Sequence, residues 1–194
     1  DIVTIMTKVG IYAILRVNGT VFDDAMVQSI FKNTLLLIGL ITSIYGVIGA
    51  IAAERLRHFV GFMVLSSVGT LLIAIAMFNT QAWSAALYYL VHSTLIAAAF
   101  YLFCGWITAQ RGTFKDHLKV APKIKNEKAA ALTYFLIAMM MAGLPPFSGF
   151  LGKVFILQAT AETAYQGWII AIILIVSLLS ILAFTRVGFI LFCL

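Results

Sequence analysis

The sequence WSAALYYLVHSTLIAAAFYLFCGWI, from Trp83 to Ile107, contains no Asp, Glu, Lys or Arg. A helix that crosses the hydrocarbon core of a bilayer needs about 20 predominantly apolar residues. Trp83 and Trp106 lie 23 positions apart, which is about 35 Å along a helix, so each can lie at one membrane interface. The run therefore predicts a transmembrane helix.

The composition of the whole chain points the same way. Of its 194 residues, 63% are hydrophobic and 10% are charged, with a mean hydropathy of +1.08, whereas soluble domains carry roughly 25% charged residues. The net charge of +6 does not indicate nucleic acid, because six of the 13 Lys and Arg residues lie between Arg111 and Lys128. Such a cluster is typical of a cytoplasmic loop. We expect a multi-pass protein of the cell inner (plasma) membrane, surrounded by lipid bilayer.

Apolar runs bounded by charges or turns predict an all-α, polytopic helical bundle with six crossings and a basic cytoplasmic loop over 109–128. The first run is the tail of a helix that ends at Arg16 and an Asn18-Gly19 turn. We expect the chain to be one transmembrane domain and an internal piece of a larger polytopic protein. The predicted spans are 2–15, 30–53, 59–78, 83–107, 129–161 and 168–184.

The fifth crossing is expected to be discontinuous. Its two short apolar halves flank Leu144-Pro145-Pro146-Phe147-Ser148-Gly149, and Gly152 follows closely. Proline removes a backbone donor and clashes with the preceding turn, so one continuous helix is excluded. Two separate crossings are the alternative. A single broken crossing is favoured because it puts Arg186 on the same side as the basic loop, and broken helices recur in transporters.

Two lysines lie deep in apolar sequence. Lys8 is eight positions before Arg16, about 12 Å along a helix, and Lys153 closely follows the predicted break. A charged lysine at the bilayer centre costs about 2.5 to 3.5 kcal/mol, so it usually faces a wet interior. Both are candidate proton-relay residues. The alternatives are a lysine near the end of a longer helix for Lys8, and one that only stabilises the break for Lys153.

His92 is the third candidate for the proton relay, because a neutral imidazole can pass a proton between its two nitrogens. Ser93 and Thr94 follow it and can hold water, although a packing role is the alternative for His92. Ser66, Ser67 and Arg57 are weaker candidates for the pathway or its mouth. For the two serines, the alternative is a hydroxyl that bonds back to its own helix. For Arg57, the alternative is an anchor at the membrane interface.

All seven acidic residues lie outside the predicted spans. The sequence also lacks phosphate-loop, nucleophile-elbow and metal-ligand patterns, so we expect no enzyme active site, cofactor or metal.

Several motifs closely resemble the D-type subunits of the multisubunit Mrp-type cation/proton antiporters, and more distantly the antiporter-like subunits of respiratory complex I. The most specific is Gly143-Leu-Pro-Pro-Phe-Ser-Gly-Phe-Leu-Gly-Lys153, and the resemblance covers nearly the whole chain. The other motifs are Thr7 to Arg16, Leu56 to Thr70, and Val91 to Leu95.

The resemblance implies the second of two inverted helical repeats, preceded by the end of the first. Lys8, His92 and Lys153 fall on the family's midplane residues of the eighth, eleventh and broken twelfth helices. Ala97 departs from several relatives, which carry a lysine there. Water or His92 would have to cover that gap.

The leading interpretation is a proton-translocating subunit that works with other membrane subunits to exchange H⁺ for Na⁺ or K⁺. The alternative is the matching subunit of a redox-driven pump, such as complex I or a membrane-bound hydrogenase. A third hypothesis is a membrane scaffold that carries no ions. It predicts that removal of the Lys8 or Lys153 charge leaves transport intact.

Overall fold

The computed structural model describes residues 2–21, 25–119, 126–161 and 165–192, and within these ranges the all-α class is confirmed. Residues 120–125 of the predicted basic loop lie outside them. The helices are α1 (Ile2–Val21), α2 (Ala25–Ala52), α3 (Leu56–Ile75), α4 (Thr80–Gln110), the short 3-10 helix η1 (Gly112–Phe114), α5 (Glu127–Ala142), α6 (Ser148–Ala159) and α7 (Gln166–Phe192).

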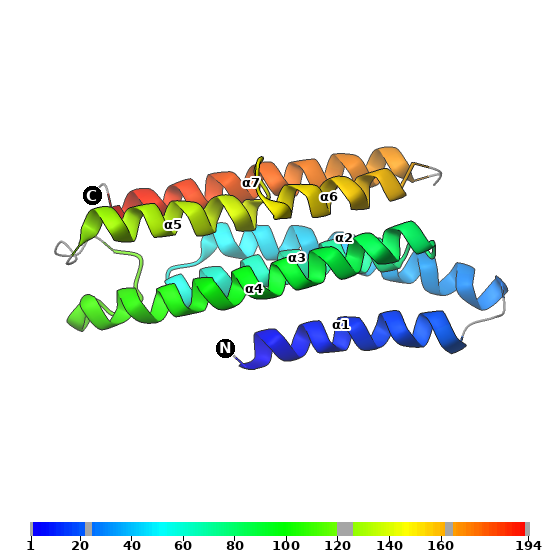
Figure 1. Cartoon of the computed structure of the whole chain (residues 1–194), viewed down its shortest axis with the longest axis horizontal. Helices are drawn as coiled ribbons and strands as arrows, with labels where there is room; N and C mark the ends of the chain where they lie inside the picture. Colours follow the sequence, from blue (N-terminus) through cyan, green and yellow to red (C-terminus); the bar gives the residue numbers. More distant parts are fainter. Residues whose placement is uncertain (1, 22–24, 120–125, 162–164, 193–194) are drawn as a thin grey trace.

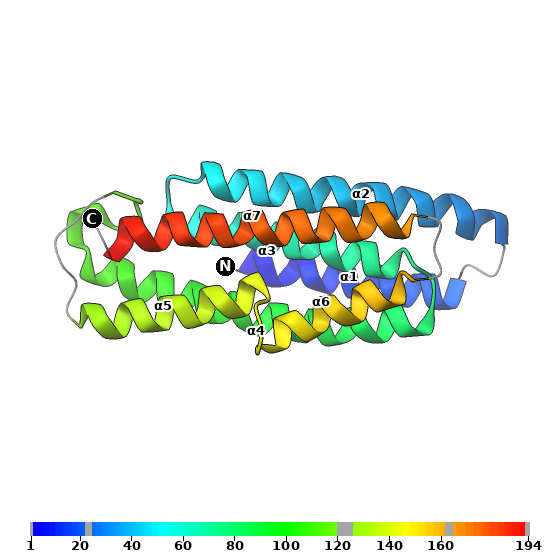
Figure 2. The same cartoon turned by 90° about the horizontal axis from the view of Figure 1, so that it is seen from above.

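The long helices lie side by side along the long axis of the molecule (Figures 1 and 2). In both views α5 and α6 follow one another along one line beside α7. Among the described residues, four helical segments are long and apolar enough to cross a membrane: Ile30–Ala52, Leu56–Ile75, Thr80–Gln110 and Gln166–Phe192. Whether α5 and α6 together make one further crossing stays a prediction.

Two helices are longer than their apolar runs suggested. The predicted turn at Asn18-Gly19 is wrong, because α1 continues through Arg16 to Val21. Arg186 lies inside α7 rather than after it. Arginine is a good helix former, and a glycine costs a helix only about 1 kcal/mol, so neither residue forces an end. Hydropathy marks the apolar part of a helix, and the helix can extend beyond it.

Glycines bring α2 and α3 into close contact. A Cβ atom on Gly46 would lie 2.4 Å from the Ser66 nitrogen, and one on Gly69 would lie 2.4 Å from the Ser43 nitrogen. Small residues at helix contacts are typical of membrane bundles, where close backbone approach replaces the hydrophobic driving force. The contact holds α3 in the middle of the molecule, and almost all of its residues from Val60 to Ile75 are buried.

One end of the bundle gathers the charged segments. The short connection after α4 pairs with the α2–α3 turn, where the Leu56 nitrogen donates to the Asp116 carbonyl at 2.7 Å. Buried Arg111 donates to the carbonyls of His117 and Lys119, and burial lowers the pKa of its guanidinium from the ordinary value. Arg186 donates to the Ile51 carbonyl near the end of α2. These charges therefore share one end of the molecule.

Candidate functional site

At the connection between α5 and α6, backbone carbonyls at the end of α5 accept hydrogen bonds from side chains of α4 and α6. Gly143 has a φ of 75° and caps α5 in the left-handed conformation, which glycine adopts without steric cost. Pro145 and Pro146 lie in the connection, as expected for residues that interrupt a helix. As a correction to the sequence-based expectation, Gly149 and Gly152 lie inside α6.

Gly149 and Gly152 allow α6 to approach α4 closely. A Cβ atom on Gly149 would lie 2.5 Å from the Met140 carbonyl oxygen and 2.7 Å from His92 Nε2. One on Gly152 would lie 2.9 Å from a ring carbon of Tyr89. These two glycines therefore make room for the side chains of α4 beside the α5–α6 connection.

Lys153 lies against the end of α5. Its Nζ donates to the Ala142 carbonyl at 2.7 Å and to Ser177 Oγ on α7 at 2.9 Å. Ala142 is the last residue of α5, where the helix dipole places partial negative charge. Lys153 thus links α6, α5 and α7.

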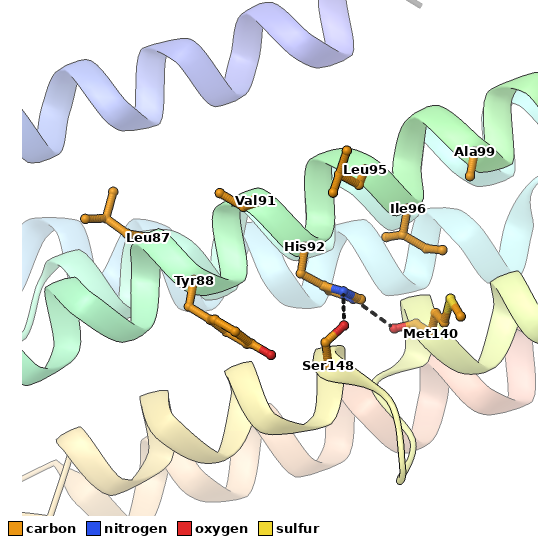
Figure 3. A pocket seen from close by; sticks show the side chains of 9 residues that line it. All are labelled: Leu87, Tyr88, Val91, His92, Leu95, Ile96, Ala99, Met140 and Ser148. Atoms are coloured by element: carbon orange, nitrogen blue, oxygen red, sulfur yellow. Dashed lines mark hydrogen bonds between the residues drawn. The ribbon is translucent and has the colours of Figure 1, made fainter.

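His92 bridges the same two short helices from α4 (Figure 3). Its Nε2 is 3.1 Å from the Met140 carbonyl and its Nδ1 is 2.8 Å from Ser148 Oγ. A carbonyl oxygen only accepts, so Nε2 carries a proton, and Nδ1 of the neutral ring accepts from the Ser148 hydroxyl. If Nδ1 gains a proton, the Ser148 hydroxyl can turn and accept instead. The histidine can therefore change protonation state without losing either partner.

Lys8 contacts a different face of α4. It is 3% exposed, and its Nζ donates to Ser93 Oγ at 3.1 Å. Ser93 and His92 are consecutive helical residues, so their side chains point about 100° apart around the axis. The Lys8 contact and the His92 contact therefore lie on separate faces of one helix. Thr94 donates to the Leu90 carbonyl of its own helix at 2.6 Å.

A small polar cavity lies beside Lys153 and contains two of the predicted pathway residues, Ser66 and Ser67. Tyr89 also lines it, and sequence reasoning missed three further polar side chains of the lining, Thr70, Ser177 and Ser180. The spacing of Ser66 and Thr70 in α3, and of Ser177 and Ser180 in α7, was an available signal. Positions three or four apart on a helix share a face, so each pair can face a common partner.

Two of the larger grooves on the outside of the described bundle include predicted site residues. A groove of about 550 Å³ runs beside Thr7 and Tyr101 and includes the exposed Arg57. Its use as a pathway mouth stays a prediction. A second groove, of about 690 Å³, has His92 and Ser148 among its lining (Figure 3). The rest of that lining is mostly apolar: Leu87, Tyr88, Val91, Leu95, Ile96, Ala99 and Met140.

Apolar helices of membrane-spanning length, packed side by side around an interrupted helix pair, define a polytopic membrane protein. Residues 2–181 match a family described as "NADH:quinone oxidoreductase/Mrp antiporter, TM". The chain belongs to this family.

Named relatives agree with the family match. The chain is 34% identical over 150 residues to the D subunit of the Na(+)/H(+) antiporter of Bacillus subtilis, covering 77% of this chain and 30% of the relative. It is 31% identical over 214 aligned positions to the D subunit of a "Probable K(+)/H(+) antiporter" of Rhizobium meliloti, covering 95% of this chain and 40% of the relative. The chain thus spans between 30% and 40% of the length of these proteins.

Solved structures show the same fold. A chain of the Mrp complex from Dietzia sp. superposes with a TM-score of 0.85 at 30% identity, covering 95% of this chain and 34% of that one. A chain of respiratory complex I from Thermus thermophilus superposes with a TM-score of 0.72 at 20% identity. The match covers 83% of this chain and 34% of that one. The second likeness shows the fold alone.

Proposed function

We propose that the chain forms the proton-conducting part of a subunit in a multisubunit antiporter that exchanges H⁺ for Na⁺ or K⁺ across the plasma membrane. The observation that carries the proposal is the set of three ionisable side chains, Lys8, His92 and Lys153, each hydrogen-bonded within the bundle. The names of the relatives support the exchanged ions and the presence of other membrane subunits.

In this proposal, a charge change at one residue alters proton binding at the next. His92 lies within electrostatic reach of both Lys8 and Lys153. A positive charge on either lysine disfavours a positive charge on His92, and it does so more strongly in a poorly solvated interior. The hydrogen bonds described for the three residues run to hydroxyls and carbonyls, so water would complete the connection between them.

The same site suits a second function, proton pumping by a redox complex. The family description names NADH:quinone oxidoreductase beside the Mrp antiporter, which supports that candidate. The two functions differ in what drives proton movement. An antiporter responds to added Na⁺ or K⁺, whereas a redox pump responds to an electron donor.

The test uses everted membrane vesicles that contain the intact complex with its full-length subunit. Added Na⁺ or K⁺ should collapse a preformed proton gradient with wild-type protein, and Lys8→Ala should abolish this response at matched expression. Lys128→Ala is the control, because Lys128 is exposed in the first turn of α5. No cation response in wild type would favour the redox pump. Full antiport in Lys8→Ala would remove Lys8 from the path.

A further inference from the structure

The end of α6 that lies away from the α5–α6 connection is attached to the start of α4. Asn79 Nδ2 donates to the Ala159 carbonyl at 3.1 Å, across 80 positions of sequence. Ala159 is the last residue of α6, and carbonyls in the last turn of a helix have no donor within that helix. Asn79 therefore supplies a hydrogen bond that α6 cannot make for itself.

The same side chain begins α4. Asn79 is the N-cap residue of α4, and its Oδ1 accepts from the Ala82 nitrogen at 2.6 Å. Because an amide has both a donor and an acceptor group, one side chain joins the first turn of α4 to the last turn of α6. Aspartate and serine cap a helix about as well as asparagine does. The cap of α4 alone therefore does not require the amide nitrogen.

The turn before Asn79 has a strained backbone. Phe78 has a φ of 51°, a value that is sterically unfavourable for a bulky side chain. The Phe78 and Trp83 ring centroids are 6.3 Å apart, and Trp83 Nε1 donates to the Ile75 carbonyl at 3.3 Å. Strain of this kind persists only where the surrounding contacts enforce it, and it is frequent at functional positions. The contacts of the turn therefore hold Asn79 in place against α6.

With the Asn79 contact, α6 is attached to α4 at both of its ends. At the first residue of α6, Ser148 Oγ lies 2.8 Å from His92 Nδ1 (Figure 3). The two attached ends of α6 lie about 17 Å apart along its axis, and Lys153 lies between them. A helix attached at one end can tilt about that end, whereas attachment at both ends fixes its direction.

We propose that Asn79 is a positioning residue that fixes the direction of α6 and thereby the place of Lys153 relative to His92. The inference rests on the proposed proton-relay function of these two residues. Lys153 Nζ reaches the Ala142 carbonyl and the hydroxyl of Ser177 only from the place where α6 holds it. Loss of the Asn79 contact lets α6 tilt and displaces Nζ. This slows proton transfer without removing a group that takes up a proton.

Asn79→Asp tests the contact, because aspartate keeps the oxygen that caps α4 but cannot donate to the Ala159 carbonyl. Asn33→Asp is the control, since it makes the same chemical change at an exposed asparagine in the first part of α2. In everted vesicles with the intact complex at matched expression, Asn79→Asp should lower the maximal rate of cation-driven antiport several-fold. The cation concentration that gives half of the maximal rate should stay unchanged. Asn33→Asp should leave both quantities unchanged.

Hydrogen exchange of the purified complex measures the same contact without transport. Backbone amides in the last turn of α6 should exchange faster in Asn79→Asp than in Asn33→Asp. Asn79→Ser should match Asn79→Asp, because serine caps α4 but lacks the amide nitrogen. Equal exchange, or equal maximal rates, in Asn79→Asp and Asn33→Asp would overturn the inference. If exchange differs but Lys153→Ala retains full antiport, the proposed function of Lys153 fails instead, and the positioning role of Asn79 fails with it.

Discussion

His92 shows how a single residue can be both a structural link and a titratable group. Its two ring nitrogens contact the end of α5 and the start of α6, at 3.1 and 2.8 Å. The Met140 carbonyl can only accept, whereas the Ser148 hydroxyl can donate or accept. The hydroxyl is therefore the partner that adapts when the ring gains a proton.

Replacement of His92 by glutamine separates the link from the titration. A glutamine amide can still donate to the Met140 carbonyl, but it does not take up a proton near neutral pH. We expect His92→Gln to assemble normally and to lose antiport by roughly tenfold or more, within the usual worth of a proton-transfer group. Cation-driven proton flux in everted vesicles measures this. Ser84→Ala is the matched control, because Ser84 is an exposed hydroxyl of the same helix. Flux equal to that of the control would exclude His92 from the relay.

The sequence predicts which residues carry the candidate chemistry, but it does not predict their partners. Lys8, His92 and Lys153 stand out because charge and imidazole are rare in apolar runs. Lys8 meets Ser93 across 85 positions of sequence, and Lys153 meets Ser177 across 24. Such contacts depend on helix rotation and packing, and an apolar helix without a polar face encodes neither strongly.

At the scale of elements, the close contact of α2 with α3 sets the position of the polar cavity. Gly39, Gly46 and Gly69 form this contact, and Ser66 Oγ crosses it to donate to the Ser43 carbonyl at 3.1 Å. Sequence inspection located both helices but gave no reason to place these glycines at their interface. The register of two helices depends on three-dimensional fit, which a hydropathy count does not contain.

Enlargement of Gly69 should separate the two helices. A Cβ atom there would lie 2.4 Å from the Ser43 nitrogen, and overpacking of this kind costs roughly 1 to 3 kcal/mol. We expect Gly69→Ala to lower the thermal unfolding temperature of the purified complex in detergent. Gly105→Ala is the control, since a Cβ atom at Gly105 meets no neighbouring atom within 4 Å. Equal unfolding temperatures for the two variants would contradict the close contact.

At the scale of the whole molecule, the arrangement of charge predicts its orientation. The Arg55 and Arg111 region lies at the end where Arg186 also bonds to α2. Sequence reasoning anticipated this grouping from the positive-inside rule, provided that α5 and α6 count as one crossing. The sequence did not predict that the connection after α4 packs against the α2–α3 turn. Backbone hydrogen bonds between irregular segments do not depend on a recognisable residue pattern.

Cysteine labelling tests that orientation. In a variant without its own cysteines, Lys119→Cys should react with a membrane-impermeant maleimide in everted vesicles and resist it in intact cells. Thr80→Cys, exposed at the start of α4, should behave in the opposite way. Trp168→Cys should match Thr80→Cys if α5 and α6 form one crossing. A Trp168→Cys pattern like that of Lys119→Cys would show two crossings.

The central claim is that Lys153 exchanges a proton and does more than stabilise the end of α5. Lys153→Arg separates these roles, because arginine keeps the charge and the donors but holds its proton at any physiological pH. The most direct measurement is cation-driven proton flux in proteoliposomes of the intact complex carrying Lys153→Arg, at wild-type levels of assembly. Our account predicts that the flux falls to the level of Lys153→Ala. Flux near that of wild type would contradict it and leave Lys153 a structural role only.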